Sequence, residues 1–158
     1  MNRRIAEGVE GAEGTEDEAG VWDGGRSADA AAEDAREVTR GVIGAAIEVH
    51  RVLGPGFLES VYEEALAVEL SLRGVPFRRQ VPVAMHYKGR PIGQARLDLI
   101  VAYRVVVELK AVEQLAPVHV SQVVSYLKAT RLRHGLLITF NVPVLRLGIK
   151  RVVHTPPS

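Results

Sequence analysis

Residues 97–110 read LDLIVAYRVVVELK, and this stretch decides the fold. It is apolar and rich in β-branched residues on both sides of a short interruption, which predicts two buried strands joined by a turn. If the hairpin is symmetric about Tyr103, Asp98 lies directly opposite Glu108, with their Cβ atoms about 4.5–5.5 Å apart. Lys110 is two residues beyond Glu108 and faces the same way, because strand side chains alternate. Three charged groups therefore converge on one face of an otherwise apolar hairpin.

This charged cluster has two interpretations. Burial of two carboxylates is costly unless a positive charge compensates for it, and a divalent cation is the natural compensation. That interpretation predicts metal-assisted hydrolysis of a phosphodiester. The alternative is a cross-strand salt bridge near a sheet edge, and the Glu-x-Lys spacing taken alone does not decide between the two. The place of the hairpin in the order of helices and strands along the chain favours the metal site.

The composition limits the class of protein. The chain of 158 residues is long enough for one domain with a substantial core. It contains no cysteine, which excludes disulfides and thiolate metal sites and suits a reducing intracellular compartment. No run approaches eighteen apolar residues, and acidic residues follow the basic start where a signal peptide needs an apolar stretch. The sequence therefore predicts a soluble cytoplasmic protein that does not enter a membrane.

Charge is distributed unevenly along the chain. Residues 1–36 carry ten acidic and four basic side chains, a net charge of −6, whereas residues 37–158 carry nine acidic and sixteen basic ones, a net charge of +7. The first segment is rich in Ala, Gly, Glu and Asp and shows little periodicity, which predicts a disordered acidic tail. The folded domain is expected over residues 37–158, and its excess of cations is compatible with a polyanionic partner.

Hydrophobic periodicity divides the folded part into helices and strands. Three- and four-residue spacings predict helices, and Gly-Pro-Gly at 54–56 ends the first of them. Alternating or continuously apolar runs predict strands, of which the first contains prolines that suit a sheet edge. The helices are expected at 37–53, 58–73 and 117–132. The strands are expected at 80–87, 97–101, 105–110, 136–140 and 145–153.

The order helix, three strands, helix, strand, with Asp on the second strand and Glu-x-Lys on the third, resembles the core of the PD-(D/E)XK nuclease superfamily. The stretch GFLESVY at 56–62 also resembles the signature of the GxxExxY protein family, a branch of that superfamily. Further similar stretches are IGAAIEVH at 43–50, VELKAVE at 107–113 and SYLKAT at 125–130. The resemblance covers residues 37–153. It implies an α/β fold with a mixed sheet, namely a restriction-endonuclease-like αβββαβ core with an extra N-terminal helix.

The resemblance also implies a metal site. Asp98 and Glu108 would ligate Mg²⁺ or Mn²⁺, hard ions that prefer oxygen, and the main-chain carbonyl of Leu109 would be a further ligand. Lys110 would orient or deprotonate the attacking water and balance charge at the scissile phosphate. Glu59 matches the first-helix carboxylate that joins the metal site in many members. The alternative for Glu59 is an ordinary carboxylate favoured by the dipole at a helix N-terminus.

The helix after the Lys strand contains a second group of candidates. Gln122 resembles a glutamine that supports the site or a phosphate in several branches, and Tyr126, four residues on, shares its helix face. Lys128, Arg131 and Arg133 make the end of this helix basic, which suits contact with a nucleic-acid backbone. The alternatives are a solvent-facing polar residue for Gln122 and ordinary complements of the helix dipole for the three cations.

These features together predict a Mg²⁺-dependent nuclease that acts on nucleic acid, with DNA as the expected substrate. Two alternatives stay open: a non-catalytic module that binds nucleic acid or protein on the same fold, and a structural subunit in which the charged cluster is a salt bridge. A homodimer is also left open, because cutting both strands of a duplex favours two copies. Leu97 stands where the superfamily pattern has proline, and the acidic tail lies outside that pattern.

Overall fold

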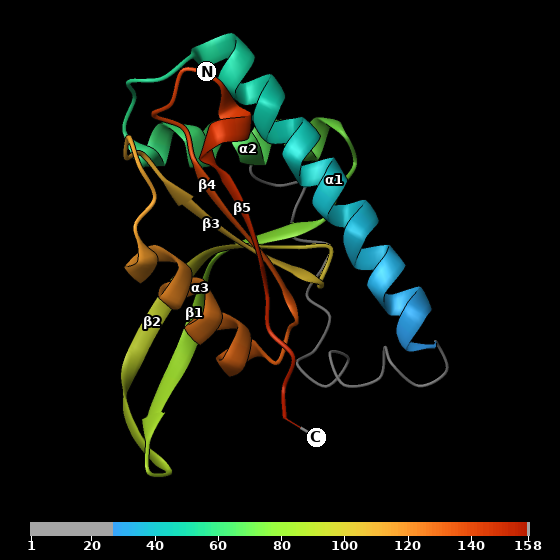
Figure 1. Cartoon of the computed structure of the whole chain (residues 1–158), viewed down its shortest axis with the longest axis vertical. Coiled ribbons are helices and arrows are strands. Elements are labelled where there is room, and N and C mark those ends of the chain that lie inside the picture. Colours follow the sequence, from blue (N-terminus) through green and yellow to red (C-terminus); the bar gives the residue numbers. More distant parts are fainter. Residues whose placement is uncertain (1–26, 158) are drawn as a thin grey trace, which may run out of the picture.

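The computed structural model describes residues 27–157, in which five strands form one mixed sheet (Figure 1). The strand order is β1-β2-β3-β4-β5, so β1 is an edge strand, as Pro82 within it predicts. β3 and β4 run parallel and are connected by helix α3 (Pro117–Thr130), whereas the other neighbours run antiparallel. The strands are β1 (Phe77–Tyr87), β2 (Arg90–Val101), β3 (Val105–Lys110), β4 (His134–Thr139) and β5 (Ile149–Val153).

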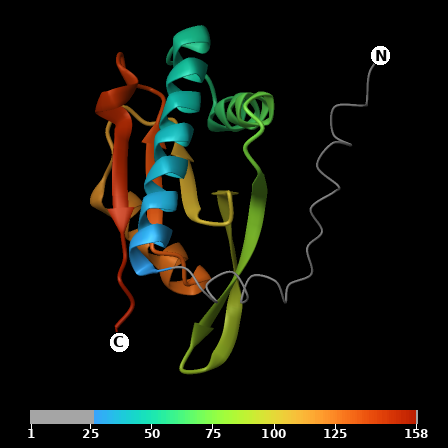
Figure 2. The same ribbon diagram turned by 90° about the vertical axis from the view of Figure 1, so that its right-hand side faces the viewer.

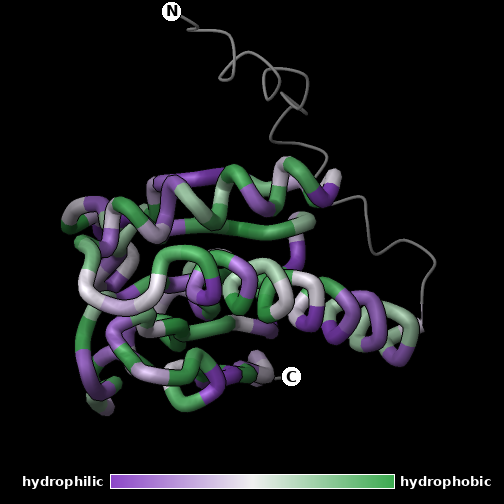
Figure 3. Tube along the Cα trace, turned by 90° about the horizontal axis from the view of Figure 1, so that it is seen from above, coloured by the Kyte–Doolittle hydropathy of each residue, from purple (hydrophilic) through white to green (hydrophobic). Residues whose placement is uncertain are grey.

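Two hydrophobic cores lie on opposite faces of this sheet. Helices α1 (Ala28–Leu53) and α2 (Glu59–Leu72) pack against one face and α3 packs against the other. The helices alternate between hydrophilic and hydrophobic residues along their turns, as expected for helices that cover a sheet with one side (Figure 3). This arrangement is the restriction-endonuclease-like core predicted from the sequence, with α1 as the extra N-terminal helix. None of the helices within residues 27–157 is long and apolar enough to cross a membrane.

The first helix begins at Ala28 rather than at the predicted Glu37. The predicted tail therefore loses residues 28–36 to the helix, and its remaining residues 1–26 lie outside the described part of the chain. The physical reason is local: the segment is rich in alanine, and the Ser27 side chain accepts a hydrogen bond from the Ala30 N–H at 3.2 Å. Ala35 is buried, and Asp34 forms an ion pair with Arg104 in the β2–β3 turn at 3.3 Å.

The last predicted strand, 145–153, is only partly a strand. Leu145–Gly148 forms a 3-10 turn, and β5 begins at Ile149. The turn buries the Leu145 side chain in the core beneath α1. Gly148 approaches the backbone of Thr139 so closely that a Cβ at this position would collide with the Thr139 carbonyl oxygen.

The β1–β2 hairpin changes sides at Gln80. Before this point Phe77 packs into the core beneath α1 and α2, whereas Val81 and Val83 pack into the core beneath α3. On β2 the same change separates Leu99 from Leu97. Gln80 has a φ of 48°, a left-handed conformation that is uncommon for a residue other than glycine. The register pairs Arg79 with Leu99 and Val81 with Leu97, so the irregular residue lies opposite Asp98.

Candidate active site

The β2–β3 hairpin has the register that the sequence predicts. Leu99 pairs with Val107 and Val101 pairs with Val105, so the ladder is symmetric about Tyr103, and Asp98 and Glu108 follow directly beyond its last pair. The Leu109 N–H donates a hydrogen bond to Asp98 Oδ2 at 2.8 Å, and the Asp98 N–H donates to Glu108 Oε2 at 3.4 Å. Each carboxylate is therefore held by the backbone of the hairpin, which fixes the pair without help from solvent.

Both carboxylates are buried, with Asp98 only 9% exposed and Glu108 only 3% exposed. Burial and, to a smaller extent, the neighbouring Asp98 charge together raise the pKa of Glu108 to about 8, against the smaller opposing effects of the Asp98 N–H and of Lys110. Burial also raises the pKa of Asp98, against the hydrogen bond from the Leu109 N–H. The free pair thus retains a proton near neutral pH, because two adjacent buried negative charges are unfavourable.

Lys110 lies on the same strand, with its Nζ 4.0 Å from Glu108 Oε1. The lysine side chain is 17% exposed, so its ammonium group is close to the carboxylates but not sealed from solvent. Its charge lowers the pKa of Glu108, yet burial outweighs this effect.

Glu59 is the first residue of α2 and lies within electrostatic reach of the hairpin charges. Partial burial raises its pKa, the charge of Asp98 raises it further, and the charge of Lys110 lowers it. The structure therefore brings together Asp98, Glu108, Lys110 and Glu59 from α2, β2 and β3. The role of each of them in catalysis stays a prediction.

Tyr62 holds the loop from which Glu59 emerges. Its hydroxyl donates to the Gly54 carbonyl at 2.6 Å and accepts from the Phe57 N–H at 3.1 Å. Its buried ring stacks on Phe140 with the ring centroids 4.4 Å apart. One side chain thus connects the end of α1, the loop and the sheet, which fixes where α2 begins.

Gln80 and Glu63 belong to the site although neither was predicted as a site residue. Gln80 Nε2 donates to Glu63 Oε1 at 2.9 Å and reaches Asp98 Oδ1 at 3.5 Å. The charge of Glu63 contributes to the raised pKa of Asp98. No signal in the sequence points to Gln80: the register at the turn, Tyr87 with Arg90, would set it opposite Leu97, and the shift between Met85 and His86 moves it opposite Asp98.

Gln122 and Tyr126 form a pair on α3, near the carboxylates. Gln122 Nε2 donates to the Tyr126 hydroxyl at 3.1 Å, and that hydroxyl donates to the Arg96 carbonyl at 3.1 Å. Tyr126 is 5% exposed, and burial followed by the charge of Glu108 raises its pKa. The ring is buried and its hydroxyl donates to the Arg96 carbonyl, so the position of Tyr126 fits support of β2 beside the site, and its contact with nucleic acid stays a prediction.

The predicted basic contacts at the end of α3 are exposed but lie away from the carboxylates. Arg133 precedes His134, which pairs with Val105 at the start of β3, whereas Lys110 at its end pairs with Thr139. The start and the end of β3 are five residues apart, which is about 17 Å along the strand, so Arg133 lies at the end of β3 away from Lys110. Lys128 and Arg131 also lie at the C-terminal end of α3. A role of these cations in binding nucleic acid stays a prediction, now separate from the carboxylate site.

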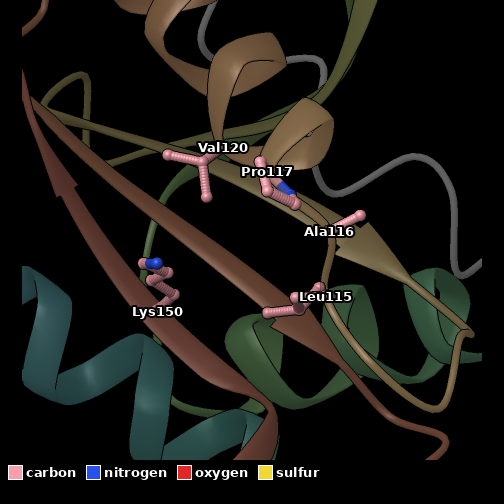
Figure 4. Close-up of a pocket in the computed structure, with 5 residues that line it drawn as sticks. All are labelled: Leu115, Ala116, Pro117, Val120 and Lys150. Carbon is pink, nitrogen blue, oxygen red and sulfur yellow. The ribbon is translucent and has the colours of Figure 1, made fainter.

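The carboxylate pair suits a metal ion that keeps several waters. Within residues 27–157 no three or more His, Asp or Glu side chains are arranged as a complete metal cage. Asp98 and Glu108 supply two oxygen ligands, and Mg²⁺ characteristically binds one or two carboxylates and retains water in its other positions. A cavity of about 280 Å³ lies elsewhere, lined by Leu115, Ala116, Pro117, Val120 and Lys150 at the start of α3 and on β5 (Figure 4), and it contains none of the predicted site residues.

Comparison with known families agrees with this geometry. A family model described as the PD-(D/E)XK nuclease superfamily matches residues 36–152, which include most of α1, all of α2, the β2–β3 hairpin and α3. Neither the curated proteins nor the solved structures returned a match.

Proposed function

Because the chain belongs to the PD-(D/E)XK nuclease superfamily, we propose that it hydrolyses phosphodiester bonds of DNA with the aid of a divalent metal ion. The observation that supports this most strongly is the buried pair of Asp98 and Glu108 with raised pKa values. Lys110 is a single cation for two carboxylates, at 4.0 Å from one oxygen. When both carboxylates are ionised, one negative charge is left without a partner, and a bound cation that displaces the proton would compensate for it.

Asp98, Glu108 and the Leu109 carbonyl would hold Mg²⁺ or Mn²⁺, with Glu59 as a further ligand. The metal would lower the pKa of a bound water and neutralise charge that develops on the phosphate oxygens. Lys110 would orient this water and hold positive charge beside the scissile phosphate. Gln122 would support the site through its hydrogen bond to Tyr126.

We also propose that the chain belongs to the GxxExxY branch, because each signature position has a separate structural reason. Gly56 has a φ of 108°, which favours glycine. Glu59 lies within electrostatic reach of Asp98 and Lys110, whose charges shift its pKa in opposite directions. Tyr62 holds the loop that contains Gly56 and leads to Glu59, through hydrogen bonds of its hydroxyl to Gly54 and Phe57. The loop, the carboxylate and the anchor thus form one unit.

A direct assay tests the nuclease proposal. The protein is incubated with plasmid DNA, linear duplex DNA, single-stranded DNA and RNA, in Mg²⁺, in Mn²⁺ and in EDTA. The proposal expects cleavage of DNA that requires the metal and is lost in EDTA. Binding of nucleic acid without cleavage under all conditions would instead favour the non-catalytic module.

A homodimer through α2 is proposed from an apolar stripe on the outer side of this helix. Leu58, Val61, Ala65, Val68 and Leu72 follow one another at spacings of three, four, three and four residues. Leu58 and Leu72 are 76% and 77% exposed, and Val68 is 52% exposed. Antiparallel pairing with a second copy would place Val61 against Leu72 of the partner subunit. It would also bring Arg73, after the end of each helix, close to the acidic first turn of the other.

Val68→Glu is expected to convert this dimer into a monomer, because it buries a charge at the centre of the stripe. Light scattering coupled to gel filtration measures the mass. Val118→Glu is the matched control, since Val118 is also an exposed valine, 67% exposed, on the opposite side of the sheet. The measurement is made at a protein concentration of about 50 µM, which exceeds the dissociation constant of a typical stable dimer. A wild-type mass equal to one chain at this concentration would contradict the proposal.

A further inference from the structure

We propose that the outer part of the β1–β2 hairpin, residues 84–95, is an arm that binds the phosphate backbone of double-stranded DNA next to the active site. We call this segment the hairpin arm; it extends away from the body of the protein (Figure 2). The inference rests on the proposed nuclease function, and it goes further by assigning a substrate form and a second contact surface.

The charge of this region has one sign. Residues 70–97 contain no Asp or Glu, whereas they contain six cations, Arg73, Arg78, Arg79, Lys88, Arg90 and Arg96. Arg73 and Arg79 are neutralised by glutamates of α2. The other four are exposed and form no ion pair with any residue between 27 and 157. An exposed two-stranded ribbon with unpaired cations attracts a polyanion.

The arm is continuous with the active site. β2 runs from Arg90 at the tip through Arg96 to Asp98 at the site, and its register with β1 continues from Val101 to Arg90 with one shift near Met85. Arg96 is two residues from Asp98, about 7 Å along the strand, and Arg90 is eight residues away, about 27 Å. B-DNA rises 3.4 Å for each base pair, so the distance from Asp98 to Arg90 corresponds to roughly eight base pairs counted from the scissile phosphate.

The shape of the arm favours duplex DNA over other nucleic acids. The major groove of B-DNA admits a two-stranded β-ribbon, whereas the major groove of duplex RNA is too narrow for one. Proteins that bind single strands stack the bases on aromatic side chains. The arm has Tyr87 as its one Phe, Tyr or Trp residue, beside His86, and Lys88 Nζ lies over the Tyr87 ring, 5.4 Å from the centroid. The surface therefore suits phosphates better than bases.

Lys88→Asn/Arg90→Gln removes two charges at the tip and tests the arm. Lys88 has a φ of 51°, which asparagine tolerates. The matched control is Lys150→Gln/Arg151→Gln on β5, the opposite edge strand of the sheet, which also removes two exposed cations. Both variants are expected to melt at the wild-type temperature, because the replaced side chains are exposed.

Binding is measured by fluorescence anisotropy with a labelled 30-base-pair DNA duplex in EDTA, over a range of salt concentrations. The arm variant is expected to bind about tenfold more weakly, and the slope of log K against log salt is expected to fall by about 1.8, or 0.9 for each lost phosphate contact. The control is expected to change neither quantity by as much. The same strand without its complement, and a duplex RNA of the same sequence, are expected to respond less to the arm substitutions.

Unchanged affinity and slope in the arm variant would overturn the proposal, as would an equal loss in the control. Equal losses on single-stranded DNA or duplex RNA would overturn its assignment to duplex DNA. The readout is binding and not cleavage. An inactive protein whose binding still depends on the arm would therefore contradict the proposed nuclease function while supporting the arm.

Discussion

Asp98→Asn and Glu108→Gln are each expected to reduce metal-dependent DNA cleavage by roughly a thousandfold, the scale of losing a group that stabilises charge in a transition state. Both replacements keep the shape and the hydrogen-bonding capacity of the side chain but remove the negative charge that would hold the metal. The rate is measured on the duplex substrate that the wild type cleaves, at saturating Mg²⁺.

Glu113→Gln is the matched control for these two variants. Glu113 is an exposed carboxylate just after β3, and its replacement is expected to leave the cleavage rate unchanged. Circular dichroism and thermal melting establish that all three variants are folded. Cleavage at the wild-type rate by folded Asp98→Asn would remove the carboxylate pair from the mechanism and leave the salt-bridge interpretation in its place.

The second large effect is on stability and has the opposite sign. In the metal-free protein at pH 9, Glu108→Gln is expected to raise the melting temperature by roughly 5 °C or more, the shift that about 1–2 kcal/mol produces in a domain of this size. Glutamine can donate to Asp98 from its amide nitrogen and accept from the Asp98 N–H, so it imitates the protonated glutamate without its charge.

The pH dependence follows from the direction of the pKa shift. The pKa of Glu108 is about 8 in the folded protein and 4.5 in the reference state, so the folded protein binds the proton more tightly. The resulting stability is fully present below pH 4.5 and is lost as the pH rises through about 8. The difference between variant and wild type should therefore be near zero at pH 5 and grow toward pH 9. A difference that is constant with pH would show that Glu108 does not titrate in this range.

The sequence was sufficient for the parts of the site that depend on a regular strand. The symmetric apolar runs around Tyr103 predicted the register of Asp98 and Glu108, and strand alternation placed Lys110 beside them. The ends of α2 and α3 were predicted to within two residues, since glycine and proline mark them. These features are local, so a single sequence contains them.

The parts that could not be predicted depend on contacts distant in sequence. Gln80 adopts a left-handed conformation within β1. The alternation of apolar and polar residues along this strand gives no sign of that conformation. The change of side at this residue lets Val81 and Val83 pack against α3, which a uniform strand would not allow. The sequence pattern predicts Tyr126 as a polar position on a helix face. In the structure its hydroxyl donates to the Arg96 carbonyl and its ring is buried.

The start of α1 shows a different limit. Composition separated residues 1–36 from the rest of the chain because they are acidic and rich in Ala and Gly. An alanine-rich segment is also a good helix former, and here the cap at Ser27 and the Asp34–Arg104 ion pair favour the helix. Net charge therefore placed the start of the first helix too far along the chain.

Calorimetric titration of Mn²⁺ tests the central claim most directly, namely that Asp98 and Glu108 form a metal site. The wild type and an Asp98→Asn/Glu108→Gln double variant are compared at pH 7 in two buffers that differ in ionisation enthalpy, with and without a DNA duplex. The account predicts that the wild type binds Mn²⁺ with release of about one proton, because the carboxylate pair must lose it, and that the double variant does not bind. Equal binding by both proteins, or no binding by the folded wild type even with DNA present, would contradict it.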